Sequence, residues 1–409
     1  MSARKIAYDI LYRIYYEDAY ASLLMRKQLQ SLSKEDRGLV SEIVYGTLRN
    51  RLYLEKQLSF YTKKPRKKST CVLLDMSAYQ ILFLDKVPSY AVVNEAVSLA
   101  NQGDKGFVNA VLRNLVQNGR KEIEEEDPLE ALCIHTSHPL WILKLWKAHY
   151  GLENTERIAK FDQTPAKVYG RINTLKTTKE SLCENPKFHF LDAYSFTYDG
   201  ILQESPEFKR GEVVIQDYAS AQIVPYLNVK KGQRIMDCCA APGTKTQQIG
   251  MLLENEGELY ASDLYEDRVH LIEELMERTG VRIAHTFVRD CCIEEKAFKE
   301  NPFDAILLDV PCSGLGDLRH KPEIRYQRHP EDLDLLVSIQ KRMLEVNANY
   351  VKQGGILVYS TCTLNKKENE YQIANFLATH QDYALLFEKT FFPFTQESDG
   401  FYVAQLRKL

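Results

Sequence analysis

Hydrophobic and polar positions in the first third of the chain repeat with a helical period. From Ile6 to about Gln117, apolar residues recur at intervals of three and four, and glycines and prolines fall between the periodic stretches. Ser33 stands at an expected helix N-cap, three residues before Asp36. The pattern predicts an all-α domain, which we place at residues 1–130.

An acidic stretch ends this helical pattern. It reads KEIEEEDP, from Lys121 to Pro128, where like charges repel one another and the proline stops a helix. Residues 131–210 then hold one helical stretch, PLWILKLWKAHYG, and short mixed runs such as KVYGRIN and SFTYDG. We expect a small α/β subdomain that links two larger domains.

From residue 211 onward, short apolar runs alternate with helical stretches. The runs are RIMD, ELYASD, AHTFVRD, DAILLDV and GGILVYS. Buried strands that alternate with helices predict a parallel sheet, so residues 211–409 are expected to form an α/β Rossmann-like domain. Ligands of such sheets bind beyond the carboxyl ends of the strands. The polar residues that end the runs are Asp237, Asp263, Asp290, Asp309 and the triplet Ser360-Thr361-Cys362.

Composition and charge narrow the class of protein. The chain has 409 residues, of which 44% are hydrophobic and 27% charged, as in an ordinary soluble multidomain protein. The N-terminus lacks the pattern of a signal peptide and no window approaches a membrane span, so we expect a cytoplasmic protein without a membrane partner. The net charge of −3 excludes a uniformly basic nucleic-acid binder, but Lys63 to Lys68 form a local basic run, KKPRKK. A solvated loop is the alternative interpretation of that run.

The nine cysteines fit neither a disulfide framework nor a zinc site. Their number is odd, two pairs are immediate neighbours (Cys238-Cys239 and Cys291-Cys292), and no CxxC or HExxH occurs. We therefore expect reduced thiols and no metal. Cys71, Cys133 and Cys183 are expected to be small core residues.

The first apolar run leads into a turn that favours a cofactor. DCCAAPGTKT, from Asp237 to Thr246, combines small residues with a glycine before a helix that should begin near Lys245. It matches neither GxGxxG nor GxxxxGK[ST], which argues against a dinucleotide and a P-loop NTPase. Asp263 stands where a carboxylate binds ribose hydroxyls, and Asp290 where one accepts from an adenine amine. A nucleoside-bearing cofactor is predicted, with helix capping as the alternative role of each aspartate.

Five motifs follow one another in a characteristic order along the C-terminal half. They are CAAPGTK, DVPCSGLG, YSTCT, ENE at Glu368 to Glu370, and DGFYVAQL. This set resembles the RNA cytosine-5 methyltransferases that use S-adenosylmethionine. In the N-terminal half, YGTLRN, VNEAVSLA and FVNAVLRNL resemble the NusB-like helical domain of the branch that acts on bacterial 16S ribosomal RNA.

The resemblance implies a cofactor and two sets of site residues. The cofactor is S-adenosylmethionine, and the residues expected to bind it are Cys239, Ala240, Ala241, Pro242, Gly243, Thr244, Lys245, Asp263, Arg268, Asp290 and Asp309. The implied catalytic residues are Cys362, Cys312, Asp309 and Lys245. Cys362 is expected to form an adduct with the base and Cys312 to assist its breakdown, while Asp309 and Lys245 lie near the base. Thr244 replaces the family's second glycine, so the backbone there must be ordinary.

Cysteine suits this reaction because cytosine C5 is a poor nucleophile. Addition of a thiolate at C6 makes C5 electron-rich, and the same thiolate must later leave. Chemistry alone does not separate the two thiols, and Cys312 remains the alternative nucleophile, because the Pro-Cys thiol attacks in DNA cytosine-5 methyltransferases. An alternative for Asp309 is a strand-end carboxylate paired with Arg319.

The resemblance also implies the partner, small-subunit ribosomal RNA, with cytosine 967 as the target. The target must be looped or extruded, since a thiol cannot reach C6 inside a duplex. The NusB-like domain and Lys63 to Lys68 are expected to bind phosphates, and Arg319, His320 and Arg325 to hold flanking nucleotides. A monomer is expected. The alternatives are a methyltransferase acting on transfer RNA or 23S ribosomal RNA, and a non-catalytic assembly factor that binds ribosomal RNA.

Overall fold

The computed structural model describes residues 2–29, 32–62 and 67–409. The chain forms two compact units: a helical unit of residues 1–165 and 318–329, and a sheet unit of residues 166–317 and 330–409. Over the described ranges, no helix is both long enough and apolar enough to cross a membrane.

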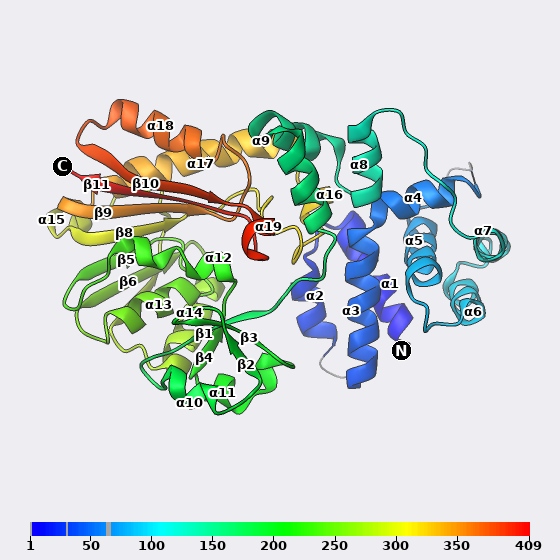
Figure 1. The fold of residues 1–409 in the computed structure, drawn as a ribbon, viewed down its shortest axis with the longest axis horizontal. Coiled ribbons are helices and arrows are strands. Elements are labelled where there is room, and N and C mark those ends of the chain that lie inside the picture. The colour runs from blue at the N-terminus through cyan, green and yellow to red at the C-terminus, as the bar shows by residue number, and fades with distance from the viewer. Residues whose placement is uncertain (1, 30–31, 63–66) are drawn as a thin grey trace. The chain divides into compact units, whose positions relative to one another are not determined.

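The helical unit contains the predicted all-α region (Figure 1). Its helices are α1 (Ala3–Tyr16), α2 (Ala21–Gln28), α3 (Lys34–Arg49), α4 (Arg51–Ser59), α5 (Lys68–Phe83), α6 (Ser89–Leu99), α7 (Lys105–Asn118), α8 (Pro128–Thr136), α9 (Leu140–Phe161) and the short α16 (Ile324–Gln327). The three-and-four spacing of α1 to α7 produces a hydrophobic core, in which Ile10, Ile43 and Leu112 are fully buried. The predicted cap is confirmed, since the Ser33 side chain accepts from the backbone N–H of Asp36 at 3.1 Å.

A small antiparallel sheet opens the sheet unit. Its strands are β1 (Tyr169–Ile172), β2 (Phe188–Phe190), β3 (Ser195–Tyr198) and β4 (Val213–Ile215), in the order β2-β3-β1-β4. Phe188 and Phe196 pack edge to face in its core, with ring centroids 4.9 Å apart. The expected α/β subdomain therefore has a sheet, while α8 and α9 belong to the helical unit. The predicted division into domains of residues 1–130, 131–210 and 211–409 remains a prediction.

The large sheet confirms the predicted Rossmann-like architecture. Its strands are β5 (Arg234–Asp237), β6 (Glu258–Asp263), β7 (Ala284–Val288), β8 (Phe303–Asp309), β9 (Val351–Thr361), β10 (Tyr383–Phe391) and β11 (Phe401–Lys408). The order is β10-β11-β9-β8-β5-β6-β7. β5 to β9 pair in parallel and are the five predicted runs, whereas β10 and β11 pair antiparallel. The carboxyl ends of β5 to β9 therefore meet at one edge.

Helices cover both faces of this sheet, as continuous apolar strands require (Figure 1). Ala305 and Leu307 face one core together with α13 (Thr244–Leu252) and α14 (Glu266–Thr279). Ile306 and Leu308 face the other core, with α17 (Pro330–Ala348) and α18 (Glu370–Thr379). The remaining helical elements are α10 (Lys179–Cys183), η1 (Leu202–Glu204), α11 (Pro206–Lys209), α12 (Tyr218–Ala221), η2 (Val224–Leu227), α15 (Lys296–Glu300) and α19 (Pro393–Gln396).

Candidate active site

The turn after β5 begins the candidate site. Gly243 caps α13 with φ +99°, and a Cβ there would lie 3.2 Å from the Cα of Ile272 in α14, so this position requires glycine. Thr244 begins the helix and has no positive φ, as predicted for a β-branched residue. The N-terminus of α13 therefore opens onto the strand-end edge, where backbone N–H groups favour negative charge.

Carboxylates follow the next two strands and lie beside exposed apolar side chains. Asp263 accepts from the Ala241 N–H at 3.2 Å and pairs with Arg268 at 3.4 Å. Asp290 lies two residues beyond β7 and accepts from the Cys292 N–H at 2.8 Å. Next to them, Leu264, Tyr265 and Ile293 are 48%, 57% and 59% exposed. An apolar surface beside carboxylates matches an adenosine, whose ring is apolar on its faces and polar at its edges.

Asp237, at the end of β5, is a buried carboxyl below the turn. Its Oδ2 accepts from Thr246 Oγ1 at 2.7 Å, and its Oδ1 has no partner within the described residues. Burial raises the pKa of Asp237 to about 7, although the hydrogen bond from Thr246 opposes that rise. Asp237 ties the strand end to α13 and so holds the turn in place.

Lys245 and Asp309 form a partly buried ion pair where the α13 N-terminus meets the end of β8. Lys245 Nζ lies 2.7 Å from Asp309 Oδ2, and Ser360 Oγ donates to Asp309 Oδ1 at 2.7 Å. Burial alone would lower the pKa of Lys245, but the Asp309 carboxylate and, more weakly, the Cys362 sulfur raise it overall. Lys245 is therefore a stable ammonium. The two oxygens of Asp309 contact Lys245 and Ser360. The alternative pairing of Asp309 with Arg319 is therefore not the one observed.

The structure brings the two motif thiols together. Cys312 Sγ and Cys362 Sγ are 3.3 Å apart, which is hydrogen-bond distance and well beyond a disulfide bond. The pKa of Cys312 is raised well above its usual value, first by the hydrogen bond to Cys362, then by burial, and then by the negative charges of Cys362 and Glu368. The raised pKa favours a protonated Cys312, and at this distance either sulfur of the pair could donate the hydrogen bond.

Glu368, for which the sequence predicted no role, forms hydrogen bonds to the loop that carries Cys312 and to the residues that follow Cys362. Glu368 is fully buried and accepts four hydrogen bonds: from Ser313 N–H at 2.9 Å, from Ser313 Oγ at 2.5 Å, from Gln340 Nε2 at 2.9 Å and from Asn365 Nδ2 at 2.9 Å. Sequence reasoning missed this function, and the only signal for it was the ENE motif itself.

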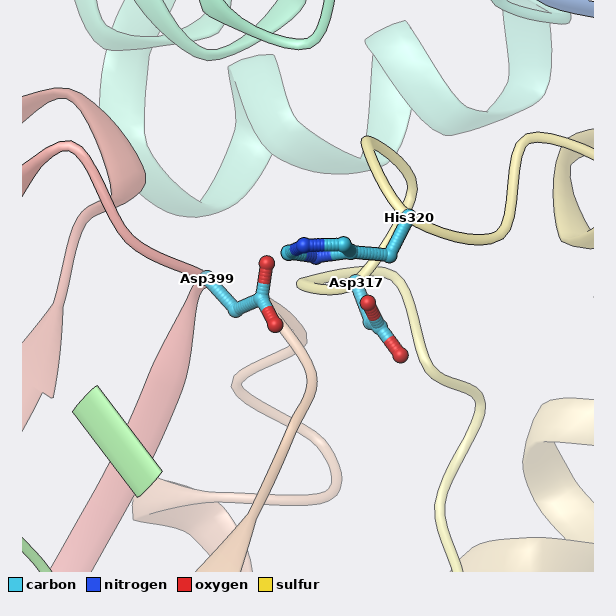
Figure 2. Close-up of side chains that lie close together, drawn as sticks. All are labelled: Asp317, His320 and Asp399. Atoms are coloured by element: carbon cyan, nitrogen blue, oxygen red, sulfur yellow. The ribbon is translucent and has the colours of Figure 1, made fainter. Parts of the chain in front are cut away.

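Two glycines bring the DGF segment against the thiol loops. A Cβ on Gly316 would lie 2.0 Å from the Gly400 carbonyl oxygen, and Gly400 N–H donates to Gly316 O at 2.8 Å. This contact places the neighbouring carboxylates Asp317 and Asp399 side by side (Figure 2). It also brings the Phe401 ring to 5.2 Å from Lys245 Nζ, a cation–π contact. Three segments far apart in the sequence therefore build one site.

The basic residues predicted to bind RNA have a mixed outcome. Residues 63–66 lie outside the described part of the chain, and Lys67 pairs with Asp104 at 3.0 Å. The expectation that Arg325 holds nucleotides is wrong, because Arg325 is fully buried and donates to backbone carbonyls of the helical unit. Arg319 is only 3% exposed and lies over the Phe161 ring, so it is not free for RNA either.

Cysteines outside the thiol pair differ in exposure. Cys71 and Cys133 are half-buried, but the expectation that Cys183 is a core residue is wrong, since it is exposed at the end of α10. Cys238 and Cys291 are buried below the cofactor turn, where the Cys291 thiol donates to the Cys238 carbonyl at 2.9 Å. Over the described residues, which include every cysteine of the chain, no disulfide is formed.

Family models match three regions of the chain. Residues 1–117 match the NusB family, residues 138–187 match a ferredoxin-like domain of RsmF/B-like methyltransferases, and residues 224–407 match the 16S rRNA methyltransferase RsmB/F family. These regions take in most of the helical unit, part of the linking segment and the large sheet.

Curated relatives match along the full chain. A probable ribosomal RNA small subunit methyltransferase B of Bacillus subtilis is 35% identical over 100% of this chain and 99% of its own length. The ribosomal RNA small subunit methyltransferase B of Vibrio cholerae is 30% identical over 100% of this chain and 98% of its own length. The similarity to these relatives thus extends from end to end of the chain.

Solved structures share the fold. The crystal structure of PH0851 superposes with a TM-score of 0.83 and covers 100% of this chain and 99% of its own, at 22% identity. A methyltransferase homolog from Pyrococcus horikoshii covers 69% of this chain and all of its own, with a TM-score of 0.62 and 28% identity.

Proposed function

The chain belongs to the family of ribosomal RNA small subunit methyltransferase B, S-adenosylmethionine-dependent enzymes, and we propose that it methylates C5 of a cytosine in 16S ribosomal RNA. Cytosine 967 is the proposed target. The methyl donor, when bound, supplies a methyl group on a positively charged sulfur. We assign its adenosine to the surface formed by Asp263, Leu264 and Asp290, and its remaining part to the turn from Cys239 to Lys245 with Arg268 and Asp309.

The observation that carries the mechanism is the 3.3 Å contact between Cys312 Sγ and Cys362 Sγ. The raised pKa of Cys312 means that this residue holds a proton at neutral pH, and a protonated thiol is a poor nucleophile. The Lys245 ammonium acts electrostatically on the Cys362 sulfur instead. This asymmetry supports Cys362 as the nucleophile and disfavours the reverse assignment.

Cys362 begins the reaction when its thiolate forms a bond to C6 of the extruded cytosine. The ring electrons displaced toward C5 would then form the bond to the methyl carbon, while the bond between that carbon and the donor sulfur breaks and leaves its electron pair on the sulfur. In the last step the C5 proton passes to water, the C5–C6 double bond forms again and the bond between C6 and sulfur breaks. The Cys312 S–H group donates to the departing Cys362 sulfur and so stabilises it as a thiolate.

Asp309 and Lys245 hold the base during these steps. The Asp309 carboxylate is 26% exposed and is fixed on both oxygens by Lys245 and Ser360. From this position it accepts from the N4 amino group at the N3 and N4 edge of cytosine, and the nearby Lys245 ammonium offsets the negative charge that develops on the ring as sulfur adds to C6. Lys245 orients the carboxylate and offsets its charge.

Substitution of Cys362 tests the proposal. Labelled S-adenosylmethionine and unmodified 16S ribosomal RNA are incubated with the wild type and with Cys362→Ala, which should lose methyl transfer by more than about 10³-fold, as nucleophile removal does in other enzymes. Cys183→Ala, at an exposed thiol far along the chain, is the matched control and should remain active.

Three results would contradict parts of this proposal. Label retained by Cys362→Ala but lost by Cys312→Ala would reverse the roles of the thiols. Label that bisulfite mapping places in transfer RNA or 23S ribosomal RNA would change the substrate. A folded wild type that transfers no label to any of these RNAs would favour a non-catalytic assembly factor.

A further inference from the structure

The buried Glu368 carboxylate is held by neutral hydrogen-bond donors, without a cation among its hydrogen-bond partners over the described residues. It is 0% exposed, and all four of its hydrogen bonds come from neutral donors on Ser313, Gln340 and Asn365. A buried charge is costly unless its lone pairs are filled, and four acceptor positions are what a carboxylate offers. The surrounding loops must therefore place a donor at each acceptor position of the Glu368 carboxylate.

The loop that depends most directly on Glu368 is the one that carries Cys312. Ser313 follows Cys312, and both its N–H and its hydroxyl donate to Glu368. Gln340 of α17 donates to Glu368 and also to the Pro311 carbonyl at 2.9 Å, so the residues on both sides of Cys312 are tied to the same group.

The nucleophile has separate anchors. Thr361, directly before Cys362, ends β9 in register with Tyr402 of β11, and its hydroxyl donates to Asn369 Oδ1 at 2.6 Å. The Cys362 carbonyl accepts from Gly316 N–H at 3.0 Å. Thr363, directly after Cys362, also contacts Ser313 Oγ at 2.6 Å, but the β9–β11 pairing holds the Cys362 side independently. Loss of the Glu368 carboxylate would therefore displace Cys312 more than Cys362.

We propose that Glu368 is a positioning residue that holds the Cys312 thiol beside the Cys362 sulfur and thereby controls release of the methylated base. This inference rests on the proposed function. In the release step the bond between C6 and sulfur breaks, its electron pair leaves with Cys362, and the Cys312 S–H hydrogen bond stabilises that thiolate. Addition of Cys362 to the ring does not need the hydrogen bond, so Glu368 acts late in the reaction.

Glu368→Gln tests the role with little change of shape. The amide has one acceptor oxygen, and its NH₂ group faces donors where the carboxylate accepted. Misplacement of a reacting group by about 1 Å can cost about 10²-fold, so methyl turnover should fall by about 10²-fold. The distinguishing measurement is the RNA adduct that survives denaturing electrophoresis, which should accumulate in Glu368→Gln as it should in Cys312→Ala.

A matched control lies two residues away. Glu370 belongs to the same motif, but its Oε1 accepts from Thr390 at 2.9 Å, away from the thiol loops. Glu370→Gln should turn over as the wild type does, without adduct accumulation. Ser313→Ala removes one of the bonds to Glu368 with less disturbance, and should show the same accumulation to a smaller extent even where Glu368→Gln folds poorly.

The outcomes separate this inference from the proposed function. Adduct in Cys312→Ala that disappears in the double variant Cys312→Ala/Cys362→Ala supports covalent catalysis itself. The positioning role of Glu368 is overturned if that adduct forms in Cys312→Ala but accumulates in neither Glu368→Gln nor Ser313→Ala. It is also overturned if the amount of adduct and the turnover rate fall together in both of these variants. If Cys312→Ala forms no Cys362-dependent adduct, the proposed mechanism fails first.

Discussion

Arg325 in the helical unit and Lys245 in the sheet unit are both buried cations, but different groups satisfy them. Arg325 Nη1 donates to the carbonyl oxygens of Arg49 at 3.2 Å and Thr136 at 3.1 Å, and Nη2 to that of Asp162 at 3.3 Å. Lys245 instead pairs with the Asp309 carboxylate. The backbone carbonyls around Arg325 stabilise its charge but cannot take part in a reaction. The Asp309 carboxylate beside Lys245 is partly exposed, so it can still contact a nucleobase.

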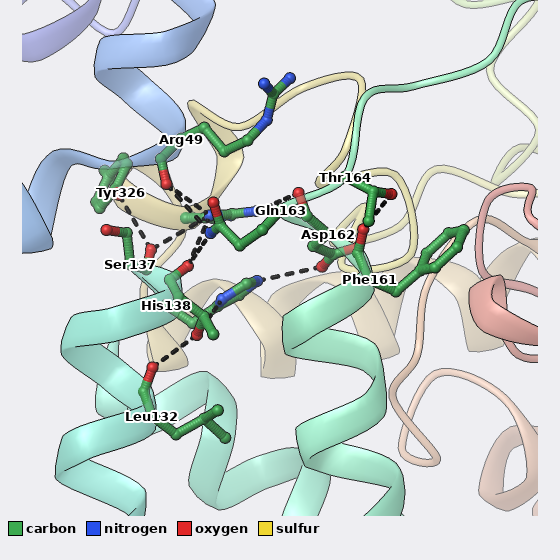
Figure 3. Close-up of polar contacts among 11 residues, drawn as sticks. Arg49, Leu132, Ser137, His138, Phe161, Asp162, Gln163, Thr164 and Tyr326 are labelled. Carbon is green, nitrogen blue, oxygen red and sulfur yellow. Dashed lines mark hydrogen bonds and ion pairs between the residues drawn. The ribbon is translucent and has the colours of Figure 1, made fainter. Parts of the chain in front are cut away.

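Helix ends explain why carbonyls suffice for Arg325. Three helices end close to Arg325 (Figure 3). They are α3, α8 and α9, whose last residues are Arg49, Thr136 and Phe161. At a helix C-terminus the carbonyl oxygens lack partners within the helix, and the helix dipole is negative. One guanidinium has enough donors to reach all three ends. Burial lowers the pKa of Arg325, and Asp162 counteracts that effect. Arg325 is therefore a structural cation that fixes helix packing, and Lys245 a functional one.

The largest expected effect that separates the two cations is on activity. Lys245→Met leaves Asp309 without its ammonium, so methyl transfer should fall by about 10³-fold, within the range for loss of a proton-handling or charge-holding group. The measurement is label transferred to 16S ribosomal RNA at saturating cofactor.

A second lysine–aspartate pair at the opposite end of the same strands supplies the control. Lys352 Nζ lies 2.8 Å from Asp304 Oδ1, at the starts of β9 and β8. Lys352→Met should change activity by no more than about twofold, because an exposed pair contributes little. Equal losses in both variants would contradict the functional role of Lys245.

The next effect is on stability and belongs to Arg325. Arg325→Met removes charge-assisted hydrogen bonds from a buried site and should lower the free energy of unfolding of the helical unit by about 3 kcal/mol. Both tryptophans of the chain, Trp141 and Trp146, lie in α9, so tryptophan fluorescence during urea unfolding reports on this unit. Arg325→Lys should be intermediate, since an ammonium cannot span three helix ends.

Arg13 provides the comparison for Arg325. It forms an exposed pair with Glu17 at 3.2 Å on α1, and Arg13→Met should cost less than about 0.5 kcal/mol. Folded Arg325→Met should keep most of its activity per molecule. A variant that unfolds as the wild type does but no longer methylates RNA would restore the original expectation that Arg325 contacts nucleotides.

The sequence predicted what depends on local pattern. Asp237, Asp263 and Asp309 end β5, β6 and β8 as expected, because buried parallel strands can be located from apolar runs and their carboxyl ends meet at one edge. The turn around Gly243 was predicted from the small residues that follow the first run, whereas the joint role of the two motif thiols was implied by the family resemblance alone.

Contacts between distant segments could not be predicted in this way. Arg325 follows the Pro-Cys loop and looked like an RNA-binding residue, but its burial depends on three helix ends that converge from positions far along the chain. Glu368 lies 55 residues from Ser313, and a glutamate before a helix predicts only a capping or solvated side chain. The partners of a buried polar group follow from tertiary packing, which no local period encodes.

The smallest of these effects concerns His138, which lies beside Arg325's acceptors and is fully buried (Figure 3). Burial first, and then the positive charge of Arg325, lower the pKa of His138 to about 4, although Asp162 opposes this with a contact of 3.1 Å. The unfolded chain, with an ordinary histidine pKa near 6.5, binds the proton more readily. Stability is therefore complete above about pH 6.5 and falls as the pH drops toward 4, by about 2 kcal/mol between pH 7 and 5.

Urea unfolding followed by tryptophan fluorescence at pH 7 and pH 5 measures this change, since the Trp146 ring lies 5.5 Å from the His138 ring. His138→Gln, which cannot take up a proton, should lose about 2 kcal/mol less than the wild type over that interval. His135→Gln, near the end of α8 and three residues before His138, is the control and should keep the wild-type dependence. Because Arg325 lowers the pKa of His138, Arg325→Met should also flatten the dependence. A dependence unchanged in both His138→Gln and Arg325→Met would show that neither the histidine nor its buried neighbour governs the acid sensitivity of the helical unit.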